Sequence, residues 1–206
     1  MKCERIPLGA QGAYLDTYFL ADSPELKAGA CRPAVVVCPG GGYAYTSDRE
    51  AEPIALALCA RGFHACVLRY PCAPARFPAA LRALAEAVAW VRAGAAENHV
   101  DPRQISVCGF SAGGHLAGSL GVFWNAPFLA AETGLAPQDM RPDKMVLCYP
   151  VITGGEFAHK GSFDNLLGAD ADAARRAEVS LEQHVTQDTP PAFLWHTYTD
   201  PGVPVE

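Results

Sequence analysis

The apolar positions follow one pattern in the first twenty residues and another in the rest of the chain. Residues 2–8 and 13–20 are alternating or apolar, and residues 9–12 between them supply a glycine-containing turn. This pattern predicts a β-hairpin. Beyond it, short apolar runs separated by helical stretches indicate strands buried on both faces, and hence a parallel sheet. The runs are residues 34–38, 65–70, 105–110, 145–149 and 192–196.

Helices are expected in the connections, because parallel strands need long crossovers. The clearest helix spans residues 78–94, where apolar side chains recur at steps of three and four and form one buried face. Others are expected over residues 50–60, 111–122 and 172–179, the last at the surface. The sequence thus predicts an α/β fold with a mostly parallel sheet, helices on both of its faces and an N-terminal hairpin.

Composition narrows the class of protein. Of the 206 residues, 50% are hydrophobic and 18% are charged, which suits a single globular domain over residues 1–206. The formal charge of -6 argues against nucleic-acid binding, because phosphate contacts need a basic surface. Charges at the N-terminus replace the apolar run of a signal peptide, and no stretch is long enough to cross a membrane. We expect a cytoplasmic protein with a small substrate and no nucleic-acid or membrane partner.

The cysteines and histidines show no metal-binding spacing. Four of the eight cysteines, namely Cys38, Cys66, Cys108 and Cys148, lie inside apolar runs. Most cysteines are therefore expected to be small core residues in a reducing compartment. No Cys-x-x-Cys or His-x-x-x-His pair occurs. We expect neither a structural metal nor a cofactor.

The strongest chemical signal is Gly-Phe-Ser-Ala-Gly at residues 109–113, between a predicted strand and a predicted helix. In hydrolases, small residues two places before and after the serine let the chain bend sharply and hold the hydroxyl clear of the backbone. The helix N-terminus adds a favourable dipole beneath a developing oxyanion. A chance match to this five-residue pattern is the alternative, and the flanking strand and helix argue against it. We predict that Ser111 is a nucleophile.

A glycine triplet at residues 40–42 follows an earlier predicted strand. It is either a flexible turn or the source of a backbone N–H that binds the oxyanion of an acyl-transfer reaction. We take Gly41 and Gly42 as candidates for one donor and the N–H of Ala112 as the other. Phosphate binding is a competing use, but the Lys-Ser/Thr pair of a P-loop and the Gly-x-Gly-x-x-Gly fingerprint are both missing.

Asp200 follows the last predicted strand in a proline-containing loop. A triad in the order Ser, Asp, His places its carboxylate after a late strand, which fits Asp200. An aspartate that caps a local Asp-Pro-Gly turn is the alternative. With Ser111 already assigned as the nucleophile, we favour the triad role.

These motifs resemble the α/β-hydrolase esterases grouped with acetyl xylan esterases and the bifunctional feruloyl and acetyl esterases. The matching stretches are residues 38–43, 109–117, 180–182 with 185–186, and 189–197. The Gly-x-Ser-x-Gly motif is common to the superfamily, whereas the Pro-Gly-Gly-Gly-Tyr loop and the Thr-Pro-Pro-x-Phe-Leu-Trp-His-Thr strand are narrower. The resemblance covers nearly the whole chain. It implies an α/β-hydrolase fold, hydrolysis of acetyl-type esters on carbohydrates, and Asp200 as the acidic residue of the triad.

The base of such a triad is not evident in the sequence. In the resembled family the histidine follows the last strand, well beyond the aspartate, whereas six residues follow Asp200 here. We therefore expect a C-terminally truncated chain that lacks the last strand and its helices, and hence exposes a sheet edge. His64, His115 and His196 are expected to be structural or surface residues. His159, in a long insertion after a strand, is the least unsuitable substitute.

Three functions are compatible with the sequence. The first is a serine esterase whose histidine lies beyond residue 206, acting on a small-molecule or carbohydrate ester. The second is a non-catalytic binding module or pseudoenzyme, for which the missing histidine is the evidence. The third is a peptidase of the prolyl-oligopeptidase type, ranked lower because no β-propeller precedes the domain. Pocket shape is expected to depend on loops at residues 43–49 and 153–164.

Overall fold

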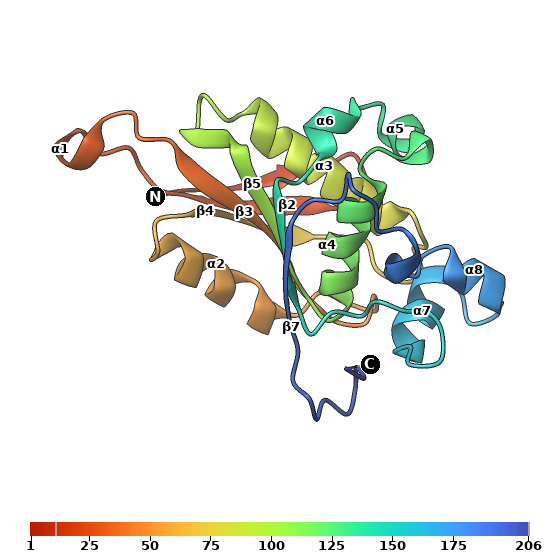
Figure 1. Cartoon of the computed structure of the whole chain (residues 1–206). Helices are drawn as coiled ribbons and strands as arrows, with labels where there is room; N and C mark the ends of the chain where they lie inside the picture. The colour runs from red at the N-terminus through yellow and green to blue at the C-terminus, as the bar shows by residue number, and fades with distance from the viewer. Residues whose placement is uncertain (11, 206) are drawn as a thin grey trace.

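A seven-stranded sheet forms the centre of the computed structural model, which describes residues 1–10 and 12–205 (Figure 1). The strands are β1 Lys2–Pro7, β2 Tyr14–Phe19, β3 Arg32–Cys38, β4 His64–Arg69, β5 Val100–Phe110, β6 Lys144–Cys148 and β7 Ala192–Trp195. Their order is β1-β2-β4-β3-β5-β6-β7. β2 is antiparallel to both β1 and β4, and all other neighbours are parallel. The mostly parallel sheet and the hairpin are confirmed; Gln11, in the predicted turn, lies outside the described residues.

Helices occupy most of the connections between the strands. They are α1 Pro24–Lys27, α2 Glu52–Cys59, α3 Ala79–Ala93, α4 Ala112–Phe123, α5 Pro127–Thr133, α6 Pro137–Met140, α7 Lys160–Leu167 and α8 Ala173–Ala177, with 3-10 turns at Asp48–Glu50 and Leu181–Gln183. α3, α4 and α8 match the predicted helices. The helix expected from residue 50 instead begins at Glu52, after a separate 3-10 turn. α7 corrects the expectation of a loop through residue 164. In the described part of the chain, no helix combines the length and apolarity needed to cross a membrane.

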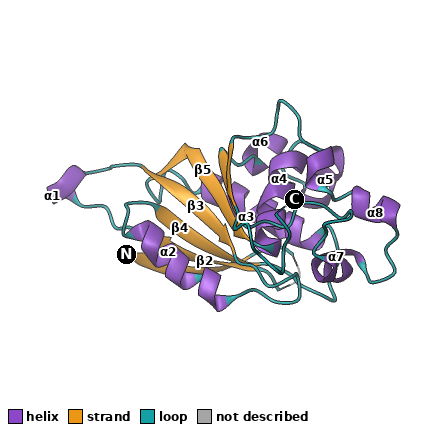
Figure 2. Ribbon diagram, turned by 60° about the horizontal axis from the view of Figure 1, so that its bottom comes forward, coloured by secondary structure: helices purple, strands orange, loops and turns teal. Residues whose placement is uncertain are grey.

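The helices cover the two faces of the sheet unequally. α2 lies along one face, and α3 and α4 lie along the other (Figure 2). The α3–α4 side holds the larger core, which includes Leu15, Leu68, Leu84, Ile105 and Leu120. The α2 side holds a smaller cluster. The four cysteines predicted for the core are buried and free.

β7 departs from its prediction. A strand buried on both faces was expected, but Phe193, Leu194 and Trp195 are 63%, 54% and 40% exposed. β7 pairs with β6 on one side and forms the edge of the described sheet on the other. The Trp195 ring meets Tyr149 edge-on, with centroids 5.4 Å apart, at the margin of the smaller cluster. An apolar strand is buried only where other elements pack against it. The sequence of the strand itself does not show whether such elements are present.

Candidate active site

Ser111 occupies the tight turn between β5 and α4. Its backbone has φ +54° and ψ -120°, a conformation that non-glycine residues rarely adopt. Hydrogen bonds hold it there: the Ser111 N–H donates to the Cys148 carbonyl at 3.0 Å, and its carbonyl accepts from His115 N and Val151 N at 3.1 Å. The predicted strand-to-helix turn is confirmed, and neighbouring segments stabilise its strained backbone.

Steric constraints require glycine at both positions of the motif that flank Ser111. A Cβ atom on Gly109 would lie 2.0 Å from the Gly113 carbonyl oxygen, and one on Gly113 would lie 2.1 Å from the Cys38 carbonyl oxygen. Both obstacles are backbone atoms, which cannot rotate away as a side chain can. The close approach of β3, β5 and α4 at this point therefore excludes any side chain at the two positions.

The glycine loop after β3 faces the Ser111 turn. Gly41 and Gly42 have φ +131° and +63°, and a Cβ atom on Gly41 would lie 2.2 Å from the Tyr45 carbonyl oxygen. Within the described chain, the backbone N–H groups of Gly41, Gly42 and Ala112 donate to no protein acceptor. Gly41 and Gly42 line the same pocket as Ser111, and Ala112 is buried directly after it.

Side chains from α4 and α7 fix this glycine loop. The buried Tyr43 hydroxyl lies 2.8 Å from His115 Nδ1, and His115 Nε2 lies 2.8 Å from the Val179 carbonyl oxygen. Because a carbonyl only accepts, Nε2 carries the proton and Nδ1 accepts from Tyr43. Burial lowers the pKa of His115 to about 4, so the ring is neutral. Asn165 Nδ2 donates to the Gly42 carbonyl at 2.9 Å.

His115 is structural, as predicted, but its link to the glycine loop was not predicted. Neither were the roles of Tyr43 and Asn165. All three contacts join residues at least 64 positions apart, and no local motif marks them.

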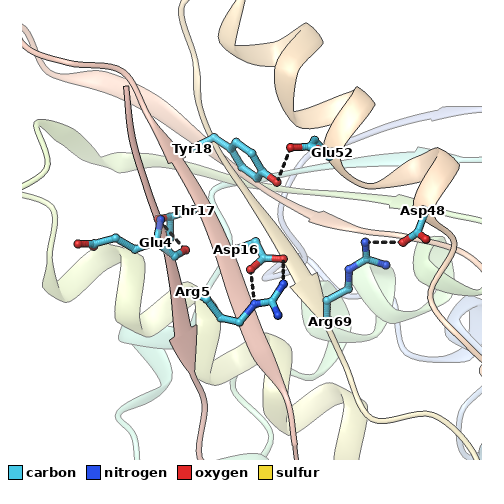
Figure 3. Close-up of polar contacts among 8 residues, drawn as sticks. All are labelled: Glu4, Arg5, Asp16, Thr17, Tyr18, Asp48, Glu52 and Arg69. Atoms are coloured by element: carbon cyan, nitrogen blue, oxygen red, sulfur yellow. Dashed lines mark hydrogen bonds and ion pairs between the residues drawn. The ribbon is translucent and has the colours of Figure 1, made fainter.

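The segment that returns from the glycine loop to α2 is anchored by Arg69, at the end of β4. Its guanidinium donates to Asp48 Oδ1 at 2.7 Å and to the carbonyl and hydroxyl oxygens of Thr46 at 3.1 Å. Figure 3 shows the Arg69–Asp48 contact beside the Arg5–Asp16 pair of the hairpin. The Arg69 side chain of β4 thus ties the return segment to the sheet.

Asp200 lies in the loop after β7. Its Oδ1 accepts from Val203 N at 3.0 Å and from Gly202 N at 2.8 Å. These two backbone bonds lower the pKa of the Asp200 carboxyl, so the group is ionised. The alternative local role, capping of the turn, is therefore observed. It leaves Oδ2 without a hydrogen-bond donor among the described residues, and this oxygen is free to accept from an imidazole.

The structure brings the candidate residues to one pocket of about 430 Å³. Ser111, Gly41, Gly42 and Asp200 all line it, at the carboxyl ends of parallel strands, where ligands bind in open α/β sheets. Ala112 does not line this pocket, and its side chain is fully buried. Among the described residues, no group of three or more His, Cys, Asp or Glu side chains is arranged to hold a metal ion.

His159 also lines this pocket, and it caps the N-terminus of α7. Its Nδ1 accepts from Ser162 N at 3.3 Å. An amide nitrogen only donates, so in the neutral ring the proton is on Nε2. A triad base needs the opposite arrangement, with Nδ1–H donating to the carboxylate and a lone pair on Nε2 toward the serine. In the part of the chain that is described, no histidine ring bonds to the Ser111 hydroxyl. Among the described residues, the His159 ring contacts Ser162 and forms no hydrogen bond with Ser111 or Asp200.

The sheet order, the strained serine turn and the glycine loop define the class of protein as an α/β-hydrolase. The chain belongs to the BD-FAE family, whose profile matches residues 21–206. It is 36% identical over 184 residues to endo-1,4-beta-xylanase B of Butyrivibrio fibrisolvens, covering 85% of this chain and 28% of that protein. It is 29% identical over 197 residues to the acetylxylan esterase of Xylanibacter ruminicola, covering 91% of this chain and 36% of that one. The chain thus spans well under half the length of these relatives.

Comparison with solved structures agrees with this family assignment. An acetyl ester-xyloside bifunctional hydrolase from Caldicellulosiruptor lactoaceticus superposes with a TM-score of 0.82 at 38% identity, over 95% of this chain and 70% of that one. A carboxylesterase from Lactobacillus plantarum superposes with a TM-score of 0.83 at 30% identity, over 99% of this chain and 74% of that one. The chain is therefore of esterase lineage, with homologues named for action on xylan.

Proposed function

We propose that this chain carries the nucleophile, oxyanion site and acidic residue of a serine esterase that removes short acetyl-type groups from carbohydrates. The observation that carries the proposal is the strained Ser111 turn, which shares one pocket with the free N–H groups of the glycine loop and with Asp200. A histidine beyond residue 206 completes the triad in this proposal. None of the described histidines is placed for that role.

In the proposed reaction, the Ser111 hydroxyl attacks the ester carbonyl while the histidine takes its proton. The oxyanion accepts hydrogen bonds from Ala112 N–H and from Gly41 or Gly42 N–H. The histidine, oriented by Asp200 Oδ2, returns the proton to the alcohol as it leaves. Water then attacks the acyl-enzyme by the same route. One oxyanion donor is worth about 10²–10³-fold in kcat in serine hydrolases.

The pocket wall supports a carbohydrate as the alcohol part of the ester. Ser47, Arg49 and His159, which carry hydroxyl, guanidinium and imidazole groups, are among its lining residues. Such groups bond to sugar hydroxyl and ring oxygens. The names of two relatives, an acetylxylan esterase and an acetyl ester-xyloside hydrolase, favour the same class of substrate.

The test is hydrolysis of acetylated xylo-oligosaccharides and of an aryl acetate by the whole gene product, including any residues encoded after Glu206. We expect Ser111→Ala to abolish the activity. Ser106→Ala, which removes a hydroxyl from the same strand, is the matched control and should retain it. Full activity in Ser111→Ala would remove Ser111 from its role.

A non-catalytic binding module is the second candidate, because no described histidine contacts the Ser111 hydroxyl. A stop codon directly after Glu206, together with carbohydrate binding that Ser111→Ala leaves unchanged, would favour it. Turnover by the whole gene product that depends on Ser111 would exclude it.

A further inference from the structure

Glu50 joins the two loops on either side of the nucleophile. It ends the 3-10 turn Asp48–Glu50, and its Oε2 accepts from Gly40 N at 2.7 Å. Its Oε1 accepts from the Tyr149 hydroxyl at 2.8 Å. Gly40 follows β3 and Tyr149 follows β6, and these are the two strands that flank β5 in the sheet. A single carboxylate therefore links the chain on both sides of β5, the strand that leads into Ser111.

The Gly40 backbone is held between this carboxylate and the nucleophile turn. A Cβ atom on Gly40 would lie 2.7 Å from Glu50 Oε2, 2.8 Å from the Phe110 carbonyl oxygen and 3.2 Å from Ser111 Cβ. Glu50 itself lines the pocket with Ser111. The position of the Gly40 amide relative to Ser111 thus depends on the carboxylate against which it packs.

Tyr149 is a reliable donor to this carboxylate. Burial first, and the hydrogen bond to Glu50 next, raise the pKa of its hydroxyl, which stays protonated. Its ring packs against Phe110 and Trp195, with centroids 6.0 Å and 5.4 Å away. The Glu50 side chain is therefore fixed at both oxygens, one of them by a side chain that packs on β5 and β7.

We propose that Glu50 is a positioning residue that aims the oxyanion donors. By taking the Gly40 N–H, it fixes the peptide that precedes Gly41 and Gly42, so that the next two amides remain available to the pocket. Glu50 touches no reacting atom in this role. The proposal rests on the proposed function for its kinetic consequence, but the backbone arrangement exists without turnover.

The chemistry of the contact predicts which variants retain the role. In Glu50→Gln, the amide oxygen can accept from Gly40 N while the amide nitrogen donates to the Tyr149 oxygen, so both links survive. In Glu50→Ala both are lost, and in Tyr149→Phe only the second is lost. Hydrogen bonding, and not charge, is the property that Glu50 contributes.

The experiment compares these variants in the whole gene product by two measurements. Amide resonances of Gly41 and Gly42 should shift in Glu50→Ala and return close to wild-type positions in Glu50→Gln. The kcat for an aryl acetate should fall about 10- to 100-fold in Glu50→Ala, with KM within about twofold, and recover to within about threefold in Glu50→Gln. Tyr149→Phe should give an intermediate loss.

Glu52→Ala is the matched control, since Glu52 lies two residues away and accepts a hydrogen bond from the Tyr18 hydroxyl of β2 at 3.4 Å (Figure 3). It should change neither measurement. Unchanged Gly41 and Gly42 resonances in Glu50→Ala would overturn the positioning role, and so would a loss in Glu50→Gln as large as that in Glu50→Ala. An inactive wild-type enzyme would refute the proposed function alone, because the resonances still report on Glu50. If Glu50→Ala does not fold, the Gly41 and Gly42 resonances of the other two variants test the proposal. They should stay close to wild-type positions in Glu50→Gln and shift in Tyr149→Phe, and unchanged resonances in Tyr149→Phe would overturn it.

Discussion

The two halves of the candidate site are held in place by different means. Ser111 has a strained backbone that segments from β6, α4 and the loop after β6 hold together. Asp200 is held by two hydrogen bonds within its own turn, beyond an edge strand whose side chains are largely exposed. A strained conformation persists only where the surrounding fold over-determines it, whereas an aspartate turn forms locally. The conformation of Ser111, the proposed nucleophile, therefore depends on the whole core, whereas that of Asp200, the proposed acidic residue, depends on a short segment.

Asp200→Asn tests the local half and should reduce activity strongly. Asparagine keeps a carbonyl oxygen for the Gly202 and Val203 amides, so the turn and the stability of the protein should persist. Activity should fall by about 10³–10⁴-fold, because an uncharged side chain no longer orients and stabilises the imidazolium. Steady-state kinetics and a urea melt of the same preparation check both parts. A loss of stability equal to that of a core substitution would break the contrast between the two halves.

Gly109→Ala tests the nucleophile half through stability. The added methyl meets the Gly113 carbonyl oxygen at 2.0 Å, so the backbone of the turn must move. We expect a loss of about 3 kcal/mol or more in the free energy of unfolding. Gly155→Ala is the control: its glycine is exposed and the added Cβ would lie 3.2 Å from a flexible threonine hydroxyl. Equal urea midpoints for the two variants would contradict the steric argument.

His115 should make stability depend on pH on the nucleophile side. The folded pKa of about 4 lies below the ordinary value of 6.5, so the unfolded chain takes up the proton first as the pH falls. The stabilisation is fully present above about pH 6.5 and is lost progressively down to about pH 4, on the order of 3 kcal/mol in all. His115→Gln should remove this part of the slope. Urea melts from pH 4 to 7 measure it, and parallel curves for the two proteins would refute it.

Phe193→Lys should have the smallest effect on stability. The Phe193 side chain is 63% exposed on edge strand β7, so little apolar burial is lost and the free energy of unfolding should change by about 0.5 kcal/mol or less. A charge on an exposed apolar edge should also reduce self-association of the 206-residue chain. Sedimentation velocity and a urea melt measure the two effects. Leu120→Ala, in the core, should cost about 2–5 kcal/mol by contrast.

The pattern of the sequence was sufficient for most of the framework. Apolar runs located all seven strands, because apolar side chains are what drives a strand into the core. The helix over residues 78–94 was predicted to within one residue of α3, since periodic side chains, Pro78 and Gly94 mark it locally. The short helices α1, α5, α6 and α7 were missed, because segments of four to eight residues show too little periodicity. The burial predicted for β7 was wrong, because burial of a strand depends on elements elsewhere in the chain.

For the site, the sequence by itself located the turn at Ser111 through its Gly-x-Ser-x-Gly motif, although the need for Gly113 comes from the approach of β3. It also located the glycine loop and Asp200, each by a motif within a few residues. Only the tertiary structure decided that these three segments share one pocket and that Glu50, Tyr43 and Asn165 fix the glycine loop. Those contacts join residues from 10 to 123 positions apart. The reason is physical: a local motif records the conformation of its own backbone, whereas a contact exists only after the sheet brings the ends of its strands together.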